Sequence, residues 1–261
     1  QAGLMERLFT GFRMMLANVK GALYIAVLVT ATLFAAATGI VGASVTILGV
    51  MAAPIMKKAG YDTRLSAGSI AAGGTLGMLI PPSIMLVVMG PVVGVPITEL
   101  FAAAVIPGVV LATLYTIYAV TRSYLNPALG PALPIEERAN SVGEIVKELL
   151  IGIVPLAVLI MSVLGSILAG LATPTDAAAM GALGAFVLSV AYRRLTWEGF
   201  KKAVFQTMII SSMILFLVAT SNFYGAVFAR LGSATMIAEA LVALELAPLV
   251  LLIVVLALIF L

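Results

Sequence analysis

The sequence predicts an all-α polytopic membrane protein with inverted repeats, re-entrant helical hairpins and a broken transmembrane helix. Of its 261 residues, 63% are hydrophobic and 10% are charged, whereas about 25% are charged in a soluble domain. The charges separate long apolar runs, and roughly 20 apolar residues suffice for a helix to cross a bilayer. Two of these runs are too long for one crossing or contain clustered glycine and proline. These three observations place most of the chain in lipid and predict helices that turn back or break there.

Two residue types on which many enzymes and metal sites depend are missing. The chain contains no histidine and no cysteine, which excludes histidine-based triads, thiol nucleophiles, disulfides and zinc or haem ligation through these residues. The net charge is +3 and the basic residues are scattered between apolar runs, so nucleic acid is not an expected partner. An intramembrane protease or lipid transferase needs a base, a metal or a pair of acids. We therefore expect a protein that is not an enzyme and that is surrounded by the lipid bilayer.

Residues 1–20 are expected to form an amphipathic arm helix at the membrane surface. Leu8 and Phe12 recur at helical spacing, and Arg7 and Arg13 lie on either side of them in the sequence. An apolar stripe beside basic side chains is typical of helices that lie along the lipid–water interface.

Residues 21–56 are expected to form the first helical hairpin. They carry no charge, and as one helix they would reach about 54 Å, far beyond a hydrocarbon core of about 30 Å. If they turn back near residues 38–44 while every other run crosses once, 13 of the 14 basic residues share one face and only Arg230 lies opposite. A single crossing would divide the basic residues ten to four. Because basic residues concentrate on the cytoplasmic side, the hairpin is favoured and the basic face is cytoplasmic.

Residues 57–121 are expected to contain a broken helix and one further span. Three glycines between residues 73 and 77 lower helix propensity, and Pro81 and Pro82 each remove a backbone donor and disfavour helix at the preceding residue. We therefore expect two half-helices joined by unwound backbone over residues 73–83. In lipid, such backbone is tolerated only where its carbonyls face protein, water or a bound ion.

The rest of the chain is expected to begin a second, inverted copy of this plan. Residues 122–148 are rich in proline and charge and predict a cytoplasmic linker, and residues 149–229 hold the scaffold-like spans of the second repeat. Residues 230–247 resemble a second arm helix, and residues 248–261 the start of a second hairpin that the sequence does not complete. Repeats of opposite orientation are a hallmark of secondary transporters. The chain is accordingly expected to be a fragment of a longer protein.

Several motifs resemble those of a known family. The segment from Ala71 to Ser83, with Gly-Gly-Thr and Pro-Pro-Ser, resembles a signature of the large membrane subunit of tripartite ATP-independent periplasmic (TRAP) transporters. Further similar stretches occur in family order at residues 33–36, 57–62, 172–179 and 195–197.

The resemblance implies a sodium-coupled importer. In such a system a periplasmic binding protein delivers an organic acid, a small membrane subunit braces the scaffold, and the large subunit carries the substrate by an elevator motion. The implied location is the cytoplasmic (inner) membrane of a bacterium or archaeon, with Na⁺ as coupling ion and no other cofactor. A non-catalytic scaffold or a pore-forming subunit is the alternative, although a pore requires polar rings along a continuous path. The substrate, the ion stoichiometry, the oligomeric state and whether the small subunit is fused stay open.

The resemblance also implies sodium ligands where the hairpin tip meets the unwound backbone. The corresponding residues here are Thr38, Gly39 and Ser44 in the turn and Gly73, Gly74, Thr75 and Gly77 in the broken helix. Ile40 and Val41 replace the two serines that family members often carry, which leaves backbone rather than side-chain ligands at these positions. Close helix packing by the glycines and a plain turn are the alternatives.

Pro82 and Ser83 are the candidate substrate residues because they begin the second half-helix. A helix N-terminus presents free N–H groups and a positive partial charge, which suit a carboxylate without any arginine. A plain N-cap is the alternative for Ser83. The segment Thr173-Pro174-Thr175-Asp176 favours a helix start over a proton relay.

Overall fold

The computed structural model describes residues 4–39, 41–132, 142–243 and 247–260. These residues are helical almost throughout and contain no strand. The helices in chain order are α1 (Leu4–Met15), α2 (Ala22–Thr38), α3 (Val41–Lys58), α4 (Thr63–Leu79), α5 (Ile84–Val93), α6 (Ile97–Leu125), α7 (Val142–Leu168), α8 (Pro174–Ala191), α9 (Trp197–Arg230), α10 (Ser233–Val242) and α11 (Pro248–Phe260). The chain divides into two compact units, Gln1–Leu195 and Thr196–Leu261.

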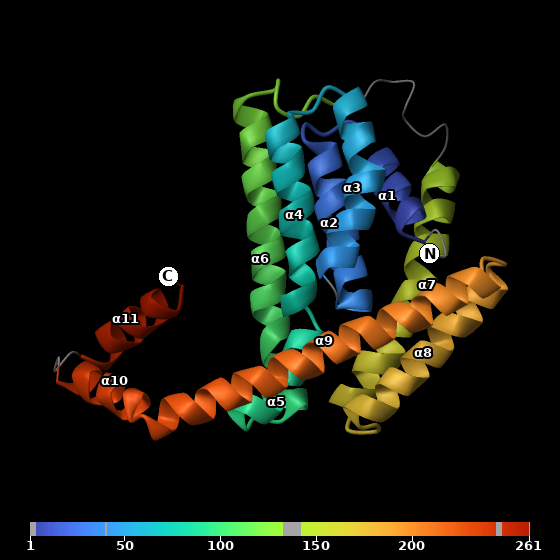
Figure 1. Ribbon diagram of the computed structural model, residues 1–261. Helices are drawn as coiled ribbons and strands as arrows, with labels where there is room; N and C mark the ends of the chain where they lie inside the picture. The colour runs from blue at the N-terminus through green and yellow to red at the C-terminus, as the bar shows by residue number, and fades with distance from the viewer. Residues whose placement is uncertain (1–3, 40, 133–141, 244–246, 261) are drawn as a thin grey trace. The chain divides into compact units, whose positions relative to one another are not determined.

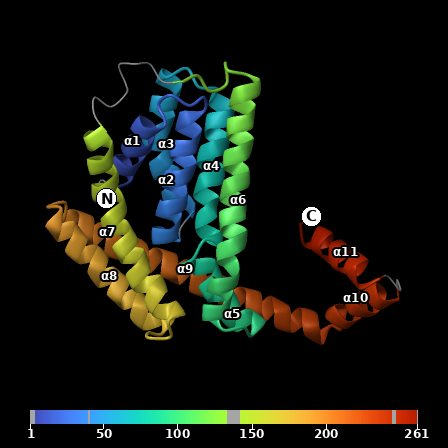
Figure 2. The same ribbon diagram turned by 180° about the vertical axis from the view of Figure 1, so that it is seen from behind.

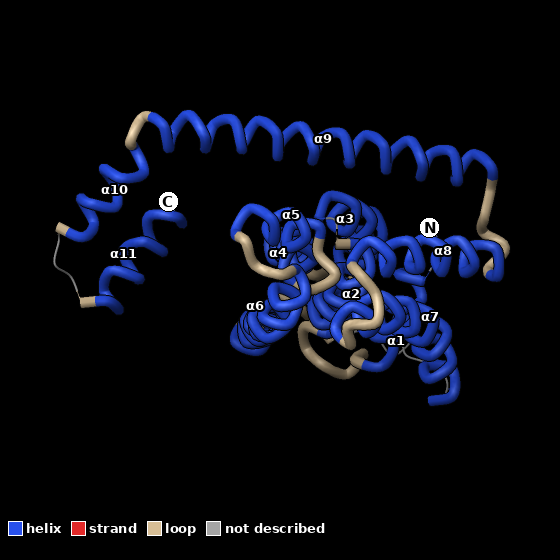
Figure 3. Tube along the Cα trace, turned by 90° about the horizontal axis from the view of Figure 1, so that it is seen from below, coloured by secondary structure: helices blue, strands red, loops and turns tan. Residues whose placement is uncertain are grey.

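Helix α2 is the centre of the first unit. Figures 1 and 2 show α2, α3, α4 and α6 side by side, and Figure 3 shows other helices around α2 in the view along its axis. The sequence of α2 contains no charged residue, and a helix that is apolar on every side is stable only where neighbours cover it. Its fully buried Tyr24 and Leu28 form a core with Leu48 and Met56 of α3 and Ile70 of α4.

The predicted hairpin is formed by α2 and α3. Helix α2 ends at Thr38, Gly39 has a φ of +61°, and α3 begins at Val41. The legs have 17 and 18 residues, so they are about 25 and 27 Å long. At the other end of the hairpin, the Leu23 N–H donates a 3.2 Å hydrogen bond to the Tyr61 hydroxyl. The two ends of the hairpin therefore lie together.

The broken helix is present, but its break is narrower than the sequence predicted. Helices α4 and α5 are bent by 43°, and only residues 80–83 leave the helical conformation. The glycines at 73, 74 and 77 stay helical and buried, so the expectation of unwound backbone from residue 73 onward was wrong. The low helix propensity of Gly73 and Gly74 is offset by their close packing against α2 and α3, and the helix breaks at Pro81 and Pro82.

Helices α6, α7, α8 and α9 are long and apolar enough to cross a membrane. The bent pair α4–α5 adds a fifth candidate span, which agrees with the predicted all-α polytopic class. Helix α8 begins as its sequence predicted: Thr173 is its N-cap and accepts a 3.2 Å hydrogen bond from the Asp176 N–H. The Thr173 hydroxyl also donates to the Asp176 carboxylate at 2.5 Å, so a helix start accounts for both side chains.

Helix α1 packs on α7 through two glycines that each face a leucine. A Cβ placed on Gly11 would lie 2.7 Å from Leu149, and one on Gly152 would lie 3.0 Å from Leu8. An ion pair of 3.1 Å joins Arg7 to Glu148 beside this contact. The arm helix is therefore held against the first turns of α7 rather than lying alone at a surface.

The second unit contains α9, α10 and α11. Helix α9 has 34 residues and no buried side chain within the described structure. Helix α10 starts after Gly232, which has a φ of +73°, and α11 is apolar along its 13 residues. The inverted relation of this unit to the first arm and hairpin stays a prediction.

Candidate functional site

The tip of the hairpin meets the break of the second helix. A Cβ placed on Gly39 would lie 2.8 Å from the Pro82 carbonyl oxygen and 3.4 Å from the Ile84 nitrogen. Only glycine combines this close approach with a positive φ at low cost. Two segments that are more than 40 residues apart in sequence thus share one site, formed largely by backbone.

The two prolines remove hydrogen-bond donors from the last turn of α4. In a continuous helix the N–H groups of residues 81 and 82 would bond to the carbonyls of Gly77 and Met78, and proline has no N–H. The Ser83 hydroxyl replaces one of them, since it donates a 2.6 Å hydrogen bond to the Met78 carbonyl. The Gly77 carbonyl loses the N–H donor that a non-proline residue at position 81 would supply, and Gly77 lies in the buried part of α4.

Ser83 has the backbone position of an N-cap but not its hydrogen bond. Its φ and ψ are extended, and its side chain makes no capping bond to α5. Ser83 is thus the N-cap residue of α5 by its backbone, while its hydroxyl is turned back toward α4 instead of capping α5. The first N–H groups of α5 are consequently left without a side-chain cap, and the first helical bond runs from the Val87 N–H to the Ser83 carbonyl at 3.2 Å.

A pocket of about 730 Å³ lies next to this break. Its lining comes from the end of α2, the break and α5, the start of α6, and the α7–α8 pair. The lining residues are Ala36, Ala37, Pro82, Ser83, Ile84, Val87, Ile97, Phe101, Leu159, Ile160, Val163, Ile167, Pro174, Thr175, Ala178, Gly181, Ala182 and Ala185. The N-terminal residues of two helices, α5 and α8, line this one pocket, and no charged side chain is among the described residues that line it. Such a pocket is apolar with a few polar groups, the composition usual for small-molecule sites.

The structure brings some of the predicted site residues together and separates others. Gly39, Pro82 and Ser83 meet at the break. Gly73 and Gly74 face the hairpin legs, where a Cβ would collide with Ala31 of α2 and Val45 of α3 respectively.

The hydroxyl-bearing candidates are dispersed. Thr75 is exposed, and its hydroxyl donates to the Ala72 carbonyl of its own helix at 2.7 Å, so its side chain does not reach the break. Ser44 is fully buried in α3. The side chain of Thr38 lies outside the described part of the structure, although its backbone ends α2.

Sequence reasoning missed the contribution of α7 and α8 to the pocket. These helices approach closely at Gly181, whose Cβ would lie 2.7 Å from Val163, and at Gly184, whose Cβ would lie 2.8 Å from Leu159. The spacing of small residues along α8 was the available signal. It predicts close packing but does not identify the partner helix.

A helical hairpin whose tip contacts a broken span defines a class of multi-pass membrane protein that is typical of secondary transporters. A family model described as "Tripartite ATP-independent periplasmic transporter, DctM component" matches residues 1–261. The chain therefore belongs to the DctM-component family of TRAP transporters, a family of permeases rather than enzymes.

Individual relatives agree with this assignment. The chain is 32% identical over 225 residues to the C4-dicarboxylate TRAP transporter large permease protein DctM of Pseudomonas aeruginosa, a match that covers 85% of the chain and 51% of the relative. It is 31% identical over 218 residues to the ectoine TRAP transporter large permease protein TeaC of Halomonas elongata (83% and 49% covered). It is 30% identical over 254 residues to the sialic acid TRAP transporter large permease protein SiaM of Vibrio cholerae (96% and 57% covered). The chain thus spans about half the length of the curated relatives it matches.

Proposed function

We propose that this chain forms part of the large permease subunit of a sodium-coupled importer of an organic carboxylate. The observation that carries the proposal is the contact of Gly39 with the Pro82 carbonyl, beside a pocket of about 730 Å³. Broken helices and hairpin tips are where secondary transporters place their ion and substrate sites. The substrates in the relatives' names, C4-dicarboxylate and sialic acid among them, support a carboxylate.

The backbone at the break supports a sodium site. Na⁺ takes neutral oxygen ligands from unwound carbonyls and helix C-terminal ends. The missing N–H of Pro81 leaves the Gly77 carbonyl without its helical donor, and the Gly39 turn lies against the same break. We assign Gly39 and Gly77 as the central backbone ligands among the seven predicted residues. Gly73 and Gly74 would then act by allowing α2 and α3 to approach α4 closely. Thr38, Ser44 and Thr75 would be weaker candidates for sodium ligands.

The pocket supports binding of an anion by helix ends. The uncapped N–H groups at the start of α5, next to Ser83, carry positive partial charge. Thr175, in the first turn of α8, lines the same pocket. A carboxylate can accept hydrogen bonds from such groups without a salt bridge. Pro82 and Ser83 would then form the floor of the substrate site.

The family supports the remaining parts of the proposal. A periplasmic binding protein would deliver the substrate, a small membrane subunit would accompany the permease, and the hairpin with the broken helix would move as one body in an elevator cycle. The assembly would lie in the cytoplasmic membrane of a bacterium.

The test is uptake of a radiolabelled C4-dicarboxylate or sialic acid into proteoliposomes that contain the complete transporter and its binding protein. We expect uptake driven by an inward Na⁺ gradient at least tenfold above that with K⁺. Equal uptake with K⁺ would contradict sodium coupling. An ion conductance that is independent of substrate would instead indicate a pore. If the chain were required only for the stability of its partner subunits, it would be a scaffold.

A further inference from the structure

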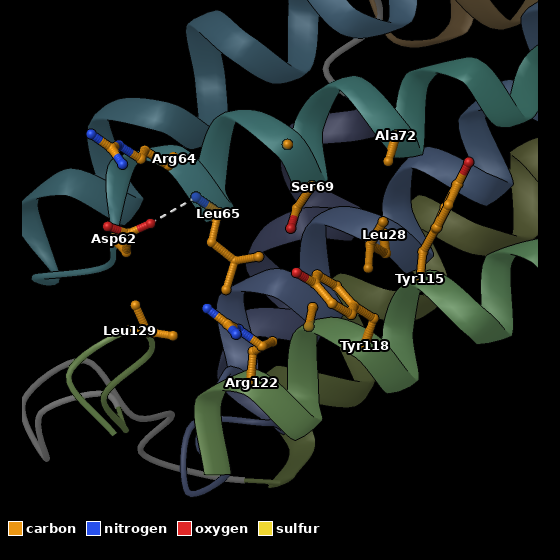
Figure 4. Close-up of a pocket in the computed structure, with 12 residues that line it drawn as sticks. Leu28, Asp62, Arg64, Leu65, Ser69, Ala72, Tyr115, Tyr118, Arg122 and Leu129 are labelled. Carbon is orange, nitrogen blue, oxygen red and sulfur yellow. Dashed lines mark hydrogen bonds between the residues drawn. The ribbon is translucent and has the colours of Figure 1, made fainter. Parts of the chain in front are cut away.

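A second pocket lies at the opposite end of the helices from the break. It has a volume of about 590 Å³ and is lined by residues of α2, α4 and α6 and of the segment after α6 (Figure 4). Helix α4 begins there at Thr63 and α6 ends there at Leu125. Helix α3 also ends here, with Lys57 and Lys58 in its last turn, and we assign this end of the unit to the cytoplasm.

The pocket has a built polar interior. Ser69 of α4 is 6% exposed, lines the pocket, and has no hydrogen bond among the described residues. Figure 4 shows its hydroxyl directed into the pocket toward the hydroxyl end of Tyr118, which extends from α6. The hydroxyl faces the pocket without a hydrogen-bond partner from the described protein residues. A ligand atom in this pocket would supply one.

The charge of the lining is positive. Arg122 of α6 and Arg64 of α4 line the pocket against a single carboxylate, that of Asp62. The Asp62 carboxylate is already engaged as the N-cap of α4, where it accepts a 2.8 Å hydrogen bond from the Leu65 N–H. Neither guanidinium has an ion pair within the described part of the chain. Two cations against one engaged anion favour a negatively charged ligand.

The remaining wall is largely apolar. Leu28, Leu65 and Ala72 line it together with Tyr115, and Tyr118 at its edge is 59% exposed. Tyrosine is enriched where membrane helices reach the headgroup level. The pocket therefore combines a cationic end at the interface with an apolar side that continues toward the hydrocarbon region.

We propose that this pocket binds an anionic phospholipid of the cytoplasmic leaflet. Its phosphate would lie at Arg122, with Arg64 at the rim, and its glycerol oxygens would reach the hydroxyls of Ser69 and Tyr118. The start of its acyl chains would cover Leu65 and Ala72. Basic pockets between spanning helices on the cytoplasmic side are suited to acidic headgroups. A lipid bound here joins α4 to α6, so it stabilises the body that carries the broken helix.

The test is native mass spectrometry of the purified transporter with added phosphatidylglycerol, phosphatidylcholine or inorganic phosphate. We expect phosphatidylglycerol to be retained in preference to phosphatidylcholine, and Arg122→Gln to weaken its binding about fivefold, the effect of one interfacial cation. Ser69→Ala should weaken it to a smaller extent. Lys58→Gln removes a cation at the same end of the unit but outside the pocket, and should leave binding unchanged.

Three results would overturn the proposal. The first is equal retention of the two lipids. The second is an equal loss of lipid binding in Arg122→Gln and Lys58→Gln. The third is displacement of the lipid by inorganic phosphate or a free dicarboxylate at equal concentration. The last result would assign the pocket to a soluble anion. Melting curves of each variant in detergent without added lipid separate loss of binding from loss of folding.

Discussion

The Ser83 hydroxyl donates a 2.6 Å hydrogen bond to the Met78 carbonyl across the break between α4 and α5. Pro82 cannot supply the N–H that this carbonyl would receive in a continuous helix. Ser83 is almost fully buried, so the bond is shielded from bulk solvent. One side chain thus compensates for part of the break that the two prolines create.

Replacing Ser83 by alanine should therefore destabilise the protein. The Met78 carbonyl would lose its donor, and loss of this partly buried bond should cost about 1 kcal/mol. We expect a lower melting temperature in detergent and reduced uptake of substrate. The matched control is Ser162→Ala, because the exposed Ser162 hydroxyl donates to the Leu159 carbonyl of an intact helix. Equal melting temperatures for the two variants would show that the bond across the break contributes nothing.

Gly39→Ala should disturb the contact between the hairpin tip and the break. A residue with a Cβ costs roughly 1–2 kcal/mol in the left-handed conformation, and the new Cβ would lie 2.8 Å from the Pro82 carbonyl oxygen. We expect uptake to fall at least tenfold. Gly42→Ala is the control, since Gly42 is helical and has no atom within 4 Å of a new Cβ. Wild-type uptake in Gly39→Ala would exclude the tip from the transport site.

Gly74→Ala should loosen the packing of α4 on the hairpin. A Cβ at this position overlaps the side chain of Val45 and lies 3.1 Å from its backbone nitrogen, and overpacking of this kind costs about 1–3 kcal/mol. Gly74→Leu should be more severe and should abolish uptake. The control is Gly68→Ala on the same helix, where nothing lies within 4 Å. If both alanine variants melt alike, Gly74 is not a packing residue.

The contrast between these glycines shows how far the sequence could predict the site. The length of the uncharged run 21–56 and the positions of basic residues were enough to predict the hairpin, because lipid leaves few alternatives. Pro81 and Pro82 were enough to predict a break. The sequence could not tell whether Gly73 and Gly74 unwind the helix or pack it, because that depends on Ala31 and Val45 of other helices.

The same limit explains Ser83 and the pocket. A serine that begins a helix is usually its N-cap, and only the three-dimensional path of the break turns its hydroxyl toward Met78. The walls formed by α7 and α8 likewise require tertiary contacts, such as that of Gly181 with Val163. Local chemistry was predictable from the sequence, whereas the partner that each group meets was not.

Gly152→Leu should separate the arm helix from α7. The Cβ alone would lie 3.0 Å from the Leu8 side chain and 3.3 Å from its nitrogen, so a leucine cannot fit without moving α1. We expect a loss of about 1–3 kcal/mol, whereas Arg7→Gln should cost less than about 1 kcal/mol because the ion pair is partly exposed. Gly165→Leu on the same helix is the control, since its nearest neighbour is the flexible end of Met161 at 3.9 Å. A larger effect of Arg7→Gln than of Gly152→Leu would contradict this assignment.

Cysteine labelling should place both ends of the hairpin on one side of the membrane. The 261 residues contain no cysteine, so single substitutions in them give an unambiguous signal. The Lys20 ammonium lies 5.8 Å from the centre of the Tyr124 ring at the end of α6, and the bond between Leu23 and Tyr61 holds the start of α2 near the end of α3. We therefore expect Lys20→Cys and Lys58→Cys to react with a membrane-impermeant maleimide only in inside-out vesicles.

The reference positions come from the two ends of α6. Its 29 residues extend about 43 Å, more than a hydrocarbon core of about 30 Å, so its ends must emerge on opposite faces. Arg122→Cys should react from the same side of the membrane as the two hairpin ends, and Glu99→Cys should react from the periplasmic side in intact cells. Labelling of Lys20→Cys and Lys58→Cys from opposite sides would mean that residues 21–56 cross once. The Gly39 tip would then lie at the wrong depth to meet Pro82, and the proposed sodium site could not form.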